Sequence, residues 1–230
     1  MAMKANRFVI SLGGSVVVPK GGIDPVFLRE TVSFFRKQAG KGRRFVVVVG
    51  GGATCRKYME AAAAVTRVPD RQMDWIGIRT TILNATLVQS VLGDMAHGKI
   101  VTDPRVRLKS AAPIIVAAGW KPGFSSDMDA VILAESFGTR TVVNLSNVSH
   151  VYDSDPRINP RARKIEKMTW PEFSRAFGTK WVPGLNAPFD PVAAVRARRA
   201  GIGVVIADGT DLRNLALILD GRKFHGTTLG

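Results

Sequence analysis

The sequence predicts an α/β protein, a three-layer αβα sandwich with a mostly parallel central sheet. Short β-branched runs alternate along the chain with longer segments of helical periodicity. This alternation is typical of βαβ units, in which helices cover both faces of a sheet. The expected strands are residues 8–12, 45–49, 114–118, 141–145 and 203–207. The expected helices are residues 25–39, 53–65, 77–92, 127–137, 191–200 and 212–219.

The domain organisation expected is one structural domain with a continuous sheet and two intimate lobes. A chain of 230 residues with 46% hydrophobic content can bury a sizeable core, and no stretch has the composition of a flexible linker. The two long irregular segments, residues 149–163 and 178–188, are rich in Pro, Gly, Asn and charge. Irregular segments of this length in a compact domain often have a function.

The charge balance favours anionic partners. There are 33 Lys and Arg against 18 Asp and Glu, a formal net charge of +15. This excess attracts nucleotides, nucleic acid and phosphorylated metabolites alike, so charge does not choose among them. The basic residues are spread through the chain, which argues against a nucleic-acid partner. No apolar run has the length of a membrane span, and the single cysteine, Cys55, fits a reducing compartment, so we expect a cytoplasmic protein.

Three glycine-rich segments follow predicted strands: Gly13-Gly14-Ser15, Gly50-Gly51-Gly52 and the segment 119–123. Ligands of open α/β sheets bind beyond the carboxyl ends of the strands, where glycine lets backbone amides reach phosphate oxygens. Any one of these segments could be an ordinary turn, but three together predict an extended anion site. Neither the GxxxxGK[ST] nor the GxGxxG phosphate motif is present. Arg56, in the first turns of the helix after Gly52, is a candidate phosphate clamp.

Two hydroxyls precede a carboxylate at the start of the predicted helix 127–137. Ser126 or Asp127 could simply cap this helix. Asp127 could instead orient lysines or a Mg²⁺ ion around a transferring phosphoryl group. Asp129 lies two residues further on, which places it on a different side of a helix. We therefore favour Asp127 as the catalytic carboxylate.

Taken together, these features resemble the amino acid kinase family over almost the whole chain. The markers are ISLGGSVVV at 10–18, VVVVGGG at 46–52, GWKPGFSSD at 119–127, SNVSHVYDSDPRINPRARKI at 146–165, FDPVAA at 189–194 and GTTL at 226–229. Within the family, the chain is most similar to the archaeal-type uridylate kinases. They share the GGS opening, the GGGxxxRKY helix start and an aspartate before IGI. Their PGxTTD pattern is also present, with Ser125 and Ser126 in place of the two threonines, a change that keeps the hydroxyls.

The resemblance implies transfer of the γ-phosphoryl group of ATP, with Mg²⁺, to UMP. It implies an acceptor-binding lobe at 1–118 and an ATP-binding lobe at 119–230, and it assigns no protein side chain to the metal. The ATP site it implies consists of Gly14, Ser15, Gly52, Arg56, Ser146, Asn147, Tyr152 and Asp155. The UMP site consists of Gly51, Asp74, Trp120, Lys121, Pro122, Gly123, Phe124, Ser125 and Ser126. Asp127 matches the carboxylate that organises the family's catalytic centre.

Some residues depart from the family pattern. Many relatives have a lysine two residues before the first glycine, where this chain has Ser11, although the archaeal-type uridylate kinases often lack this lysine as well. The aspartate-glycine of the ATP loop is Ser149-His150 here, and we interpret His150 as a substituted turn residue. Because phosphoryl charge must be neutralised, another lysine has to replace the missing one. Lys180, in the second irregular segment, is the preferred candidate and Lys121 the second.

Alternative functions remain open at this stage. The chain could be a kinase for another small phosphate or carboxylate, a nucleotide-binding sensor or storage protein, or a nucleic-acid-binding protein. Isopentenyl phosphate kinases have a histidine near the second glycine segment, whereas His97, His150 and His225 lie elsewhere. Relatives form dimers or hexamers, so a homo-oligomer is expected.

Overall fold

The central sheet of the protein explains where its functional residues meet. We describe it from a computed structural model, which places residues 6–106, 110–156, 158–180 and 187–230. Within these residues the sheet has seven strands in the order β3-β2-β1-β4-β8-β9-β7. The strands are β3 (Ile114–Ala117), β2 (Arg44–Val49), β1 (Arg7–Leu12), β4 (Thr141–Ser146), β8 (Gly203–Asp208), β9 (Thr227–Leu229) and β7 (Lys167–Met168). All neighbours pair in parallel except β8 and β9, so the mostly parallel sheet is confirmed.

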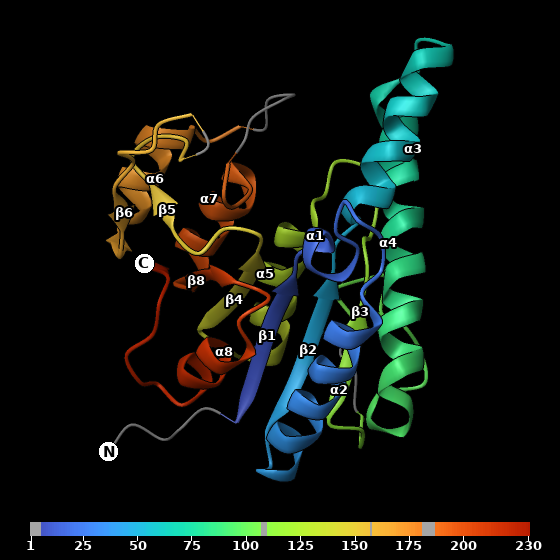
Figure 1. Ribbon diagram of the computed structural model, residues 1–230, viewed down its shortest axis with the longest axis vertical. Coiled ribbons are helices and arrows are strands. Elements are labelled where there is room, and N and C mark those ends of the chain that lie inside the picture. The colour runs from blue at the N-terminus through green and yellow to red at the C-terminus, as the bar shows by residue number, and fades with distance from the viewer. Residues whose placement is uncertain (1–5, 107–109, 157, 181–186) are drawn as a thin grey trace.

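Helices cover both faces of this sheet, as the sequence predicts (Figure 1). One face packs against α1 (Gly14–Val17), α2 (Pro25–Gly40), α4 (Asp70–Leu92) and α8 (Leu212–Leu219). The other packs against α5 (Ser126–Phe137), α6 (Trp170–Phe177) and α7 (Pro191–Ala200). The central strands are buried on both faces, which is why they are continuous apolar runs such as the buried valines of β2.

Some elements differ from the sequence-based expectation. Helix α4 begins at Asp70 and not at residue 77, because its first two turns lie outside the core and lack an apolar stripe. Helix α6 was missed, although Thr169 and Glu172 form a capping box at its start and a proline follows. The irregular segment from 149 contains one strand of a small hairpin, β5 (Val151–Tyr152) paired with β6 (Lys164–Ile165).

Helix α3 (Gly52–Val65) projects beyond the carboxyl ends of the central strands, together with the first turns of α4 (Figure 1). A short 3₁₀ turn, η1 (Gly93–Met95), follows α4. No helix among the described residues is long and apolar enough to span a bilayer. The carboxyl edge of β1, β2 and β4 is therefore bordered by α3, α4 and the amino end of α5, which is where the three glycine segments lie.

Candidate active site

The first two glycine segments are in direct contact. A side chain at Gly14 would lie 2.0 Å from the backbone nitrogen of Gly52, and one at Gly52 would lie 2.3 Å from the Gly14 carbonyl oxygen. Gly52 also has a φ of +65°, which favours glycine. Asn84 of α4 fixes this junction, because its Nδ2 donates to the carbonyl oxygens of Gly50 and Gly51, each at 2.9 Å. The close approach of the two segments thus depends on glycine at both positions.

Asp127 stands at the start of α5, half-buried beside the end of β1. Its Oδ1 accepts a hydrogen bond from the Ser11 hydroxyl at 3.1 Å, and its Oδ2 accepts one from the Asp190 amide at 3.0 Å. Burial is the main cause that raises the pKa of Asp127 to about 6, and the nearby charge of Asp190 adds to it. The residue that replaces the relatives' lysine therefore contacts the predicted catalytic carboxylate directly.

Asp190 joins this centre, and the sequence analysis did not assign it a role. Its carboxylate accepts a hydrogen bond from the Ser125 hydroxyl and one from the Val192 amide at 2.8 Å, as the N-cap of α7. Ser125 itself caps α5 by accepting from the Met128 amide, so the cap is neither Ser126 nor Asp127. The position of Asp190 before Pro191 indicates a helix cap in the sequence, but nothing in the sequence indicates its contact with Asp127.

Asp129 lies beneath the third glycine segment. It is fully buried, and its Oδ2 accepts a hydrogen bond from the Trp120 amide at 3.1 Å. Among the described residues, its Oδ1 has no hydrogen-bond partner. Its pKa is raised to about 7, mainly by burial, with a contribution from the charges of Asp103 and Asp127. As predicted, Asp129 faces a different direction from Asp127, yet it supports a segment expected to bind the acceptor.

The predicted acceptor residues lie together. Asp74 Oδ2 accepts a hydrogen bond from the Gly123 amide at 2.8 Å, which joins α4 to the third glycine segment. Thr81, further along α4, accepts from the Gly119 amide at 2.9 Å. The rings of Trp120 and Phe124 meet edge to face, with centroids 4.7 Å apart. Gly51, Lys121, Pro122, Ser125 and Ser126 complete the group predicted for UMP.

The two candidate lysines have different surroundings. Lys121 is exposed, and its Nζ lies over the rings of Trp120 and Phe124, at 4.0 and 4.8 Å from the centroids. A cation–π contact of this kind holds the ammonium group at the aromatic pair. Lys180 is exposed and makes no hydrogen bond or ion pair with the described residues. It directly precedes residues 181–186, which lie outside the described part of the chain.

The residues predicted for ATP fall in two groups. Gly14, Ser15, Gly52 and Arg56 belong to the two glycine segments and the helices that follow them, with Arg56 exposed on α3. Ser146, Asn147, Tyr152 and Asp155 lie at the end of β4 and in the following segment. Both groups follow neighbouring parallel strands, β1, β2 and β4, and so occupy the same edge of the sheet.

The segment after β4 is anchored to the last strand. The Val151 amide donates to Thr227 Oγ1 at 2.8 Å, and the Thr227 hydroxyl in turn donates to the carbonyl oxygen of Ile165. His150 is buried, and its Nδ1 is 3.0 Å from the Ser149 hydroxyl. Burial lowers the pKa of His150, and the charge of Lys164 lowers it further. A buried, neutral imidazole fits the predicted role of a substituted turn residue.

Comparison with known proteins identifies the family. Residues 6–208 match the amino acid kinase family. The chain belongs to this family. It is 36% identical to the uridylate kinase of Methanospirillum hungatei over 95% of this chain and 92% of the relative. It is 34% identical to the uridylate kinase of Pyrococcus abyssi over 97% and 99% of the two chains.

A solved structure extends the likeness to three dimensions. The crystal structure of uridylate kinase from Archaeoglobus fulgidus superposes with a TM-score of 0.82 at 28% identity, covering 99% of this chain and 100% of that one. The αβα architecture predicted from the sequence is thus the amino acid kinase fold.

Proposed function

We propose that this protein is a uridylate kinase that transfers the γ-phosphoryl group of ATP to the phosphate of UMP, giving UDP. The observation that carries the proposal is the end-to-end match with archaeal uridylate kinases, in a chain whose first two glycine segments touch and whose Ser11 contacts Asp127. Phosphoryl transfer of this type needs positioning and charge neutralisation more than covalent chemistry. Two glycine segments in direct contact and one ionisable carboxylate suit that task.

In this proposal each lobe binds one of the two substrates. Residues 1–118 and the segment 119–126 bind UMP. The Asp74 carboxylate, which lies at the Gly123 amide, accepts hydrogen bonds from the ribose hydroxyls. Residues after β4 hold the adenosine of ATP, and the Gly14–Gly52 junction holds its phosphates. The phosphoryl group then passes between the lobes beside Asp127.

Magnesium fits the donor set as a companion of ATP. The described residues contain no cluster of three or more His, Cys, Asp or Glu able to hold a metal. Mg²⁺ usually keeps several waters and binds through substrate phosphates with one or two carboxylates. Asp127 is the carboxylate placed to contribute, and the ion would neutralise phosphate charge. The protein's own part is to orient both substrates and exclude water.

A homo-oligomer remains part of the proposal. The side chains of Tyr58, Val65 and Leu83 on α3 and α4 are 65%, 85% and 61% exposed. Such apolar exposure on two adjacent helices is the surface on which a second copy would pack. Sedimentation equilibrium of the wild type and of Leu83→Glu measures this, and a monomeric wild type would refute it.

A substrate panel tests the catalytic proposal. With MgATP, we expect kcat/KM for UMP to exceed that for AMP, GMP or isopentenyl phosphate by at least about tenfold, since a site built for one acceptor discriminates through its hydrogen bonds. Asp127→Asn, purified in the same way, controls for contaminating kinases. Comparable turnover of isopentenyl phosphate would identify another kinase. Nucleotide binding without turnover would identify a sensor or storage protein.

A further inference from the structure

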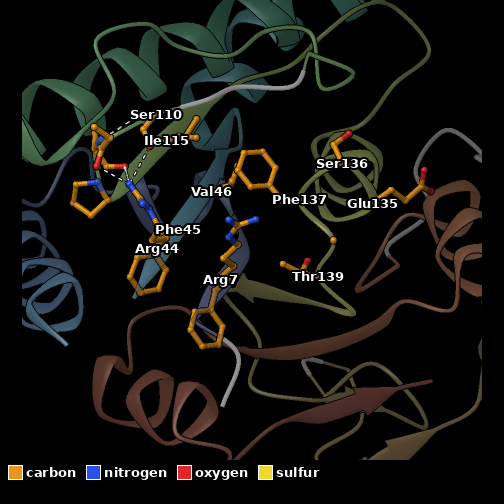
Figure 2. A pocket seen from close by; sticks show the side chains of 15 residues that line it. Arg7, Arg44, Phe45, Val46, Ser110, Ile115, Glu135, Ser136, Phe137 and Thr139 are labelled. Carbon is orange, nitrogen blue, oxygen red and sulfur yellow. Dashed lines mark hydrogen bonds between the residues drawn. The ribbon is translucent and has the colours of Figure 1, made fainter. Parts of the chain in front are cut away.

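A cavity of about 770 Å³ opens at the amino end of the sheet, opposite the candidate active site (Figure 2). It lies between the first residues of β1, β2 and β3 and the last turn of α5. Ligand sites for small molecules have volumes in this range. None of the residues assigned to catalysis or substrate binding lines it.

Two arginines share the sheet side of this cavity. Arg7 and Arg44 are register partners in the parallel pair β1 and β2, so their side chains leave the same face of the sheet. Neither forms an ion pair with a carboxylate among the described residues. Like charges on neighbouring strands are destabilising, so this pair carries a cost that a bound anion would remove.

The two guanidinium groups have different roles. Arg44 Nη2 donates to the carbonyl oxygens of Ser110, Ala111 and Ala112, at 3.0, 2.6 and 3.3 Å, which fixes its position. Arg7 has no hydrogen bond to the described residues, and Figure 2 shows it pointing into the cavity. One arginine is thus held in place by the protein, and the other is available to a ligand.

The α5 side of the cavity supplies an apolar wall and a hydroxyl. Phe137 of α5 and, across the cavity, Ile115 of β3 provide the apolar surface. The Oγ1 of Thr139 is buried and, within the described residues, has no hydrogen-bond partner. Among the described lining residues the one carboxylate, Glu135, is neutralised by Arg196, with two hydrogen bonds of 2.8 Å. The positive charge of Arg7 and Arg44 is therefore not cancelled from this side.

We propose that this cavity is a second ligand site, which binds a phosphate-bearing organic molecule of about mononucleotide size. The phosphate contacts Arg7 and Arg44, because guanidinium groups form paired, charge-assisted hydrogen bonds with phosphate oxygens. The planar or apolar part of the ligand packs on Phe137 and Ile115. The site is separate from the active site, so its test does not depend on the proposed reaction.

The test is a titration of the full chain labelled with ¹³C in the isoleucine δ1 methyl groups. Ile115 lines the cavity, whereas Ile78 packs at Gly119 in the candidate active site, so each methyl reports on one end of the sheet. ATP and pyrophosphate are the probes. We expect saturable shifts of Ile115 with both, and tighter binding of ATP because its nucleoside adds apolar contact.

Arg7→Gln should raise the Kd of ATP measured from the Ile115 methyl shift by at least about tenfold, which is the scale of a lost hydrogen bond to a charged group. The Kd measured from the Ile78 methyl shift should stay unchanged. Arg36→Gln, which removes the same charge from an exposed position on α2, should change neither. An Ile115 response that is absent in the wild type, or unchanged in Arg7→Gln, would overturn the proposal. Arg7 would then serve only to complement the helix dipole at the end of α5. Equal affinity for pyrophosphate and ATP would overturn the role of the apolar wall.

Discussion

The contact between Ser11 and Asp127 leads to a quantitative prediction about the pKa of Asp127. Its pKa is raised to about 6 from an ordinary value of 3.8, which corresponds to about 3 kcal/mol against the ionised form. No cation offsets the burial of Asp127 within the described residues. Ser11→Lys places an ammonium group near the carboxylate. At about 4 Å and an effective dielectric constant of about 20, the attraction is about 4 kcal/mol, enough to cancel the shift.

The measurement is a pH titration of the protein labelled with ¹³C in its aspartate carboxyl groups, without substrates. We expect the Asp127 resonance to titrate near pH 6 in the wild type and at or below its ordinary pKa in Ser11→Lys. Ser11→Met introduces similar bulk at this buried position without charge, and should leave the pKa at or above 6. A wild-type pKa near 4, or equal values in the Lys and Met variants, would refute the reasoning. The acid limb of the kcat/KM profile should move in the same direction.

Three further predictions concern neighbouring residues. The pKa of Asp129 is raised from 3.8 to about 7 in the folded state, so the stability of the protein falls as pH rises between these two values. Asp129→Asn removes this ionisation and should raise the melting temperature more at pH 8 than at pH 5. An equal change at both pH values would contradict this. Lys180→Ala should lower kcat by about 10²–10³-fold if Lys180 replaces the missing lysine. Arg56→Ala should mainly raise KM for ATP. If Lys121→Ala loses kcat and Lys180→Ala does not, the positive charge comes from the third glycine segment. Asp155→Ala should raise KM for ATP more than KM for UMP, and an effect confined to UMP would mean that the two lobes are reversed.

The main strands and helices could be predicted because apolar periodicity determines them. The bounds of α7 and α8 agree with the sequence pattern, and β1, β2 and β3 agree within a residue. Strands β7 and β9 could not be found in this way. They have two and three residues, and they exist because of pairing with each other and with β8. No local pattern distinguishes so short a strand from an extended loop.

The candidate site was predictable only in part. The glycine segments and Asp127 follow strands or start a helix, so position along the chain was enough to group them. The contact of Asp190 with Asp127 joins residues far apart in sequence, and it depends on how α7 packs beside α5. Asp129 was ambiguous for another reason. Residues 128–134 of α5 are buried on every side, so the helix has no polar face that would show where a carboxylate points.

The position of positive charge is the remaining question of mechanism. The protein has a large excess of basic residues, yet the centre at Asp127 contains carboxylates and hydroxyls without a cation among the described residues. A transferring phosphoryl group brings further negative charge, which cannot accumulate in a half-buried site without neutralisation. We expect this charge to come with the substrates, as Mg²⁺ bound to ATP, and from a lysine of the protein, for which Lys180 is the preferred candidate. A carboxylate with a raised pKa fits this requirement, because a cation bound beside Asp127 would lower that pKa and favour the ionised form.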